Sequence, residues 1–179
     1  MLAYVFWHTP GPIEAIAPYE AALAAFHRRL DPADIRGFRG SQAFLVEGAV
    51  WASSPVVYED WYLVDDFGAL GELNIAAVSG HRQQPHDGVA RMAGVGMAGI
   101  YALRQGVGGL SDARRAAWFS KTAGVSYDEF YRRLGPRGSL WQRQMNLGPT
   151  PEFCSLGDDD PPSGAVTVTR VRSVGASVP

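Results

Sequence analysis

Residues 116–134 read AAWFSKTAGVSYDEFYRRL, and this stretch decides the fold that we expect. The pattern predicts a short apolar strand over residues 116–121, a turn over 122–124 that ends in glycine, and then a helix. Ser126 and Glu129 have the S-x-x-E spacing of a capping box, in which the serine hydroxyl accepts from an amide of the first helical turn. The stretch therefore predicts a strand–turn–helix unit.

The N-terminus follows the same plan. Residues 2–8 read LAYVFWH and predict a strand, and a turn with proline and glycine follows over residues 9–12. Apolar residues at positions 16, 19, 23, 26 and 30 then indicate an amphipathic helix over 13–30. Because this helix also ends in an aromatic residue followed by Arg-Arg-Leu, the two units suggest a duplicated α+β fold.

Composition sets limits on size and partners. The chain has 179 residues, of which 46% are apolar and 19% are charged, so it can form one large domain or two small fused domains. A net charge of −2 gives no basic footprint for nucleic acid. Residues 2–8 are apolar, so the N-terminus lacks the basic region of a signal peptide, and no apolar run is long enough for a membrane span. With a single cysteine, Cys154, we expect a cytoplasmic protein without an internal disulfide.

The middle of the chain completes the first unit. The pattern predicts strands over 38–47, 56–64 and 98–105, and a helix that is capped by Asp65 or Asp66 and extends to Gly80. Residues 81–96 are polar and then rich in glycine, so we expect a long loop. The order β-α-β-β-α-β predicts an α+β fold, namely a ferredoxin-like antiparallel sheet with helices on one face.

Three regions follow from this order. Residues 1–106 form the first repeat, and residues 110–156 form a second, partial repeat that packs on the first. The second repeat comprises the strand at 116–121, the helix at 126–134, a strand at 139–145 and a short segment at 152–156. Residues 157–179 are an extended C-terminal tail that forms either an edge strand or a segment ordered only against a partner.

The residues FSKTAGVSYDEFYRRL at 119–134, together with the succession of strands, resemble the ferredoxin-like dimeric α+β barrel group. This group includes EthD-like proteins, antibiotic-biosynthesis monooxygenases and chlorite-dismutase relatives. The resemblance implies that two sheets, from two subunits or two fused repeats, enclose a pocket, and that the protein is a homodimer or a pseudo-dimer. It transfers the location of a pocket rather than a catalytic residue. The long insertion at 81–96 and the C-terminal extension depart from the group.

Two predicted strands carry ionisable residues that a purely structural sheet would rarely bury. Alternation along a strand places Tyr58, Asp60 and Tyr62 on one face and Glu59 and Trp61 on the other. In the same way, Tyr4, Phe6 and His8 share a face of the first strand.

The catalytic candidates are therefore His8, Glu59 and Asp60. A pocket with His8 as general acid and base, oriented by Glu59 or Asp60, would explain the pattern, since imidazole titrates near neutral pH. Alternatively, His8 only ends its strand at the proline turn, and both carboxylates pair with arginines.

Further strand residues are candidates for substrate binding. Arg104 and Arg143 either fix an anionic group of a ligand or form structural ion pairs. The aromatic residues either belong to the core or line a pocket that accepts an aromatic molecule; they are Tyr58, Trp61, Tyr101 and Trp141.

The remaining histidines and the cysteine are not predicted to form part of a functional site. His81 and His86, followed by Asp87, could bind a metal, but they lie on a predicted glycine-rich loop without a clear third ligand. We therefore predict neither a metal site nor a cofactor. Cys154 has no setting typical of a nucleophile. His27 is interpreted as a histidine that ends its helix and is favoured there by the helix dipole.

Two hypotheses from different classes remain. The first is an EthD-like or monooxygenase-like enzyme that acts on a small aromatic or apolar molecule without a bound cofactor. The second is a non-catalytic small-molecule-binding or assembly domain whose aromatic strands form a subunit interface. A closed cavity with convergent polar groups favours the enzyme, and a flat apolar face covered by another chain favours assembly.

Overall fold

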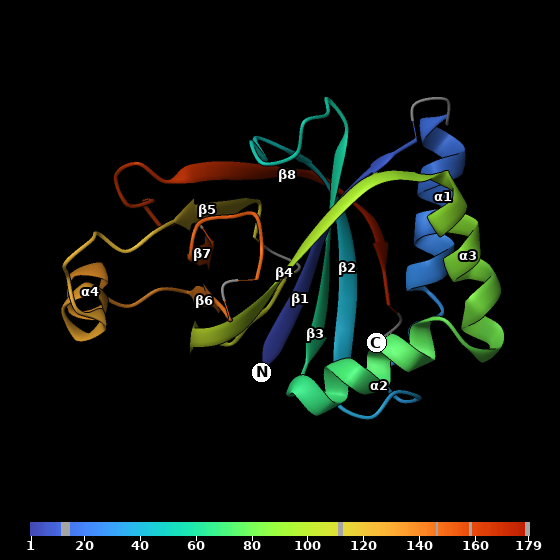
Figure 1. Ribbon diagram of the computed structural model, residues 1–179, viewed down its shortest axis with the longest axis horizontal. Coiled ribbons are helices and arrows are strands. Elements are labelled where there is room, and N and C mark those ends of the chain that lie inside the picture. The colour runs from blue at the N-terminus through green and yellow to red at the C-terminus, as the bar shows by residue number, and fades with distance from the viewer. Residues whose placement is uncertain (12–14, 111–112, 146, 158, 178–179) are drawn as a thin grey trace.

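The computed structural model describes residues 1–11, 15–110, 113–145, 147–157 and 159–177 (Figure 1). In these ranges the chain forms eight strands: β1 (Leu2–Pro10), β2 (Phe38–Glu47), β3 (Val57–Val64), β4 (Ala93–Gly106), β5 (Arg115–Phe119), β6 (Ser139–Arg143), β7 (Phe153–Leu156) and β8 (Val166–Ala176). The helices are α1 (Ile16–His27), α2 (Phe67–Ala77), the short 3₁₀ helix η1 (Gly80–Arg82), α3 (Gln83–Met92) and α4 (Tyr127–Leu134).

All eight strands belong to one closed antiparallel barrel with the order β1-β3-β2-β8-β5-β7-β6-β4. The predicted ferredoxin-like sheet with helices on one face is therefore wrong, and so is the description of the chain as a ferredoxin-like α+β barrel. The sheet is not open, because β8 pairs with β2 and β5 while β4 pairs with β6 and β1. Closure removes the exposed strand edges that an open sheet leaves unpaired.

The barrel has two halves with corresponding strand orders, and it closes within one chain. The first half contributes β4-β1-β3-β2, and the second contributes β8-β5-β7-β6 in the same positions. In the second half α4 connects β5 to β6, whereas the described residues between β7 and β8 contain no helix. The halves therefore differ in how much helix covers them.

The prediction of a long loop over residues 81–96 is wrong, because most of these residues are helical. The segment contains η1, α3 and the first residues of β4. Val89 and Met92 of α3 pack in the same apolar cluster as Leu23 and Phe26 of α1, so tertiary contacts stabilise a helix whose local sequence is rich in breakers. At the start of α1, the predicted helical residues 13 and 14 lie outside the described residues.

Both expected helix caps are present. Asp66 Oδ1 accepts a hydrogen bond from the Ala69 amide at 2.9 Å and begins α2. Ser126 Oγ accepts from the Glu129 amide at 3.2 Å and begins α4. The Glu129 carboxylate pairs with Arg133 of the same helix at 2.5 Å.

The C-terminal segment is part of the barrel. Residues 166–176, which we expected as an edge strand or tail, form β8 and pair on both sides. Residues 158, 178 and 179 of the expected tail lie outside the described residues. Because β8 joins β2 to β5, this segment connects the first half of the barrel to the second.

Side chains on alternate strand positions fill the barrel interior. The interior cluster contains all five tryptophans of the chain: Trp7, Trp61, Trp118 and Trp141 are fully buried, and Trp51 packs against them. Packed aromatic rings thus occupy the space where the resemblance implied a pocket.

Helices cover two separate parts of the outer surface (Figure 1). α1, α2 and α3 lie against the first half, where they share an apolar cluster with β1, β2 and β3. α4 lies at the opposite end and packs on β5, β6 and β7 through Phe130 and Tyr131. Among the described residues, no helix has the length and apolar character needed to cross a membrane.

Candidate functional site

The candidate site is built on the outer face of β1 and β3. The two strands pair antiparallel, with Phe6 opposite Asp60, Tyr4 opposite Tyr62 and His8 opposite Tyr58. Since alternate residues of a strand share a face, these side chains point together toward the helices. The register therefore places His8 diagonally beside Asp60.

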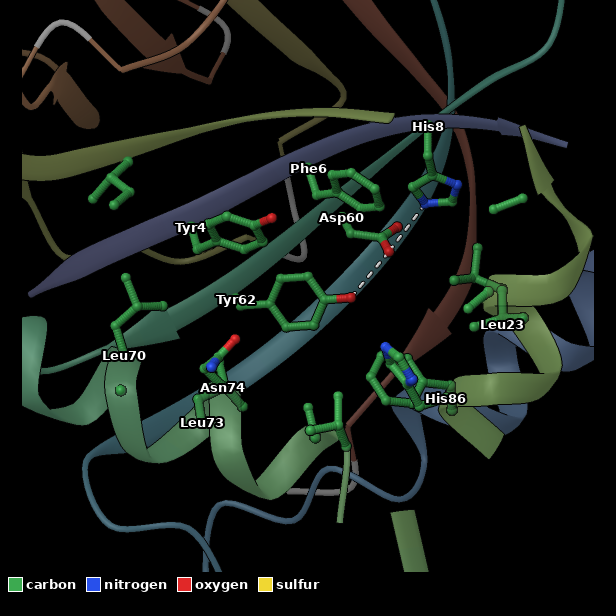
Figure 2. Close-up of a pocket in the computed structure, with 18 of the residues that line it drawn as sticks. Tyr4, Phe6, His8, Leu23, Asp60, Tyr62, Leu70, Leu73, Asn74 and His86 are labelled. Atoms are coloured by element: carbon green, nitrogen blue, oxygen red, sulfur yellow. Dashed lines mark hydrogen bonds and ion pairs between the residues drawn. The ribbon is translucent and has the colours of Figure 1, made fainter. Parts of the chain in front are cut away.

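A cavity of about 730 Å³ lies between this face and the three helices (Figure 2). Its walls are apolar or aromatic for the most part, as is usual for small-molecule sites. β1 and β3 contribute Tyr4, Phe6, His8, Asp60 and Tyr62, and the helices contribute Tyr19, Leu23, Phe26, Phe67, Leu70, Leu73, Asn74, His86 and Val89.

Asp60 is the centre of a buried polar cluster in this cavity. Its Oδ2 accepts hydrogen bonds from Tyr62 Oη at 3.1 Å and from His27 Nε2 at 3.2 Å. His8 Nε2 lies 3.1 Å from the same oxygen, an ion-pair distance without the alignment of a hydrogen bond. Asp60 Oδ1 is buried and has no hydrogen-bond partner among the described residues.

The environment keeps the Asp60 carboxyl ionised. Burial by itself raises its pKa, but the electrostatic attraction of His8 and His27, together with the hydrogen bond of His27, outweighs burial and holds the pKa well below its usual value. The neighbouring phenols respond in the opposite way, because burial first and the Asp60 charge second raise the pKa of Tyr62 and of Tyr19. The cluster thus holds one carboxylate among neutral hydroxyls.

Each imidazole is also held at its other nitrogen. His8 Nδ1 lies 2.5 Å from Tyr19 Oη, and His27 Nδ1 lies 2.8 Å from Ser41 Oγ. If Tyr19 donates its hydroxyl proton to His8 Nδ1, the ring proton of neutral His8 sits on Nε2 and faces the Asp60 carboxylate. This assignment gives an Asp60–His8–Tyr19 chain that begins at a buried charge and ends at a hydroxyl in the cavity wall.

The structure brings together two of the three residues that we predicted as catalytic. His8 and Asp60 meet in the cavity, whereas Glu59 points from the opposite face of β3 into the barrel. There Glu59 accepts from Trp7 Nε1 at 2.9 Å and from Trp61 Nε1 at 2.7 Å, and it pairs with Arg170 at 3.4 Å. This fully buried pair connects the first half of the barrel to β8.

The predicted substrate-binding residues lie elsewhere. Arg104 donates to Gln142 at 2.8 Å on the outer face of β4, and Arg143 donates to the carbonyls of Gly148 and Thr150. The aromatic candidates are fully buried away from the cavity: Trp61, Tyr101 and Trp141 in the barrel interior, and Tyr58 beside His8, with its hydroxyl on Glu20.

Sequence reasoning missed several residues that line the cavity, and it also missed His27, which contacts Asp60 but does not line the cavity. Tyr19 and His27 are eight residues apart on α1, so a helix places both on one face, and this is the signal that could have identified them. His27, which we interpreted as a helix end, is fully buried behind Asp60. Asn74 and His86 reach the cavity from α2 and α3, and nothing local in the sequence indicates this contact.

In the part of the chain that the structure describes, no three His, Cys, Asp or Glu side chains are arranged to hold a metal ion. His86 Nδ1 lies 3.1 Å from Asp87 Oδ1, and His81 is in η1.

No protein-family model, curated protein or solved structure matches this chain. The function must therefore be argued from the site itself.

Proposed function

We propose that this protein binds a small, largely apolar or aromatic molecule in the cavity outside the barrel and catalyses proton transfer on it. The observation that carries the proposal is the Asp60–His8–Tyr19 chain at the wall of an apolar cavity of about 730 Å³. The groups that carry out this acid–base chemistry are side chains of the protein itself.

In the Asp60–His8–Tyr19 chain, the Tyr19 hydroxyl is the group that contacts the bound molecule. When Tyr19 takes a proton from the ligand, its own proton passes to His8 Nδ1 across 2.5 Å. His8 then becomes an imidazolium, which the Asp60 carboxylate 3.1 Å from Nε2 stabilises. Return of the proton to another position of the ligand restores the chain.

The apolar walls have two roles in this proposal. Leu23, Leu70 and Leu73 provide area for an apolar body of the ligand, and they keep water away from the polar cluster. A low local dielectric strengthens the attraction between an imidazolium at His8 and Asp60. Binding and proton transfer thus use the same enclosure.

A deuterium-exchange experiment tests the proposal. Ligands are first selected from small aromatic and apolar compounds by thermal shift, and exchange of their acidic C–H groups with D₂O is then followed by NMR. We expect the wild type to accelerate exchange and both Tyr19→Phe and His8→Gln to slow it by about 100-fold, the usual effect of losing an acid–base group.

Tyr127→Phe is the matched control, since its hydroxyl is on α4 and donates to Glu152 outside the cavity. This variant should exchange at the wild-type rate. The catalytic proposal fails if Tyr19→Phe and His8→Gln both exchange as fast as the wild type, and binding in the cavity fails if no compound shifts the melting temperature.

Location and assembly are also proposals. A cytoplasmic location is supported by the single cysteine, Cys154, which is buried and unpaired in the barrel interior. Dimerisation stays a prediction that rests on the resemblance alone. The barrel itself closes within one chain.

A further inference from the structure

The charges around the cavity limit the kinds of ligand that fit it. Asp60 is the one carboxylate among its described lining residues, and no lysine or arginine is among them. The other polar groups of the wall are histidines, phenols and Asn74. An anionic ligand would therefore meet a buried carboxylate without a lysine or arginine to offset it, which is unfavourable.

Asp60 also has an unused acceptor. Its Oδ2 is surrounded by Tyr62, His27 and His8, but Oδ1 is buried and has no donor among the described residues. A buried carboxylate oxygen without a partner is costly, and such atoms in native proteins usually have a specific reason. A ligand that donates to Oδ1 would satisfy it.

Aromatic rings surround this carboxylate. Phe6 is directly opposite Asp60 in the β1–β3 register, and the Tyr4 ring lies 6.3 Å from Phe6 and 5.9 Å from Tyr62 between ring centroids. All three rings line the cavity beside Asp60 (Figure 2). Ring faces attract cations, so rings next to a carboxylate form a favourable environment for an ammonium group.

We propose that the ligand of this cavity is an amine, bound as an ammonium ion to Asp60 Oδ1, with its apolar part against the leucines of α1 and α2. This inference rests on the proposed function for the existence of a ligand in the cavity, and it adds the chemical class of that ligand. An amine supplies both the donor that Oδ1 lacks and a positive charge that no lysine or arginine of the described cavity wall provides.

Protons compete with such a ligand. The groups that face Asp60 are His8 and Tyr4 from β1, His27 and Tyr19 from α1, and Tyr62 from β3, with Asn74 of α2 and His86 of α3 farther along the cavity. A proton taken up by this cluster and an ammonium ion would neutralise the same carboxylate. Acid should therefore weaken binding of the amine, and the amine should displace a proton in the pH range where binding weakens.

Three probes with the same ring test the inference, namely 2-phenylethylamine, 2-phenylethanol and 3-phenylpropionate. Isothermal titration calorimetry of the full chain at pH 8 should show the amine binding at least tenfold more tightly than the alcohol, and the carboxylate weakest. Lowering the pH to 6 should weaken the amine about tenfold and the alcohol less than twofold. Titrations at pH 6 in two buffers of different ionisation enthalpy should show proton release with the amine alone.

Asp60→Asn should remove the preference for the amine, whereas Asp65→Asn, an exposed carboxylate paired with Arg39, should preserve it. If Asp60→Asn does not fold, the pH dependence and proton release of the wild type still decide the matter. Equal or tighter binding of the alcohol in the cavity overturns the amine but leaves the proposed function intact. Absence of binding by all three probes at millimolar concentration rejects the inference, and a failed thermal-shift screen separately rejects the proposed function.

Discussion

At the outer face of the barrel, Asp60 accepts from Tyr62 and lies within ion-pair distance of two imidazoles. Strand alternation predicts that Asp60 and Tyr62 share a face, and that His8 shares a face with Phe6. The sequence alone does not show that these two faces are the same one, because the register of β1 against β3 depends on long-range pairing. Because side chains alternate along β3, Glu59 lies on the opposite face of the strand and points into the barrel.

A pH-dependent stability measurement tests the role of Asp60. The folded-state pKa of Asp60 is lowered, so its ionised form contributes stability above the pKa of the unfolded chain, about 3.9, and this contribution is lost as the pH falls through the folded-state value. Asp60→Asn should therefore lower the free energy of unfolding at pH 7 by about 3 kcal/mol, the cost of breaking a buried pair. The difference from the wild type should shrink below pH 4.

Urea denaturation followed by tryptophan fluorescence at pH 7, 4 and 3 measures both quantities. Asp65→Asn is the control, since solvent screens its exposed pair with Arg39 and the loss at pH 7 should be much smaller. A loss at Asp60 that is equal at pH 7 and pH 3 would contradict ionisation as its source.

At the scale of elements, local signals and tertiary contacts predict different parts of the fold. Strand β2 has the predicted bounds, and the caps of α2 and α4 are present, because alternation and capping are written in a few adjacent residues. α3 was missed because Pro85 and Gly88 lie within it and argue against a helix. Its packing against α1 overrides this local preference.

Substitutions at the two helix caps distinguish the effect of α2 on the cavity from that of α4. Asp66→Ala and Ser126→Ala should each cost about 1 kcal/mol of stability, the typical effect of losing an N-cap. α2 lines the cavity with Leu70, Leu73 and Asn74, whereas α4 lies at the opposite end of the barrel (Figure 1). Asp66→Ala should therefore weaken binding of 2-phenylethylamine several-fold, and Ser126→Ala should leave it unchanged.

Thermal denaturation and calorimetric titration of the two variants give both values. If Ser126→Ala weakens binding of the amine as much as Asp66→Ala does, then α4 influences the cavity across the barrel and the separation of the two ends is wrong.

On the scale of the whole molecule, the chain contains two units with corresponding strand orders, yet the expected architecture was wrong because the sheet closes. Nothing local distinguishes an open sheet from a barrel: closure depends on β8 pairing with β2, which lies far away in sequence. The same closure brings the interior tryptophans together and fills the space between the halves. The cavity is consequently outside the barrel, where three helices cover only the first half.

The buried pair of Glu59 on β3 and Arg170 on β8 is a polar contact that joins the halves through the interior. Arg170 also donates to the carbonyls of Leu110 and Ala113 and lies 4.2 Å from the ring centroid of Phe44. Removing one partner leaves the other charge buried, so Glu59→Gln and Arg170→Met should each lower the free energy of unfolding by about 3–5 kcal/mol.

The double variant should lose less than the sum of the single losses, with a coupling energy of about 1–3 kcal/mol, because the second substitution removes an already unpaired charge. Urea denaturation measures the cycle, and tryptophan fluorescence reports on it directly since all five tryptophans lie in or against the interior cluster. Glu20→Gln with Arg172→Met is the matched cycle, because this pair also involves β8 but is partly exposed. Its coupling should stay below about 1 kcal/mol. Additive losses at Glu59 and Arg170 would show that packing of the rings, and not the ion pair, holds the two halves together.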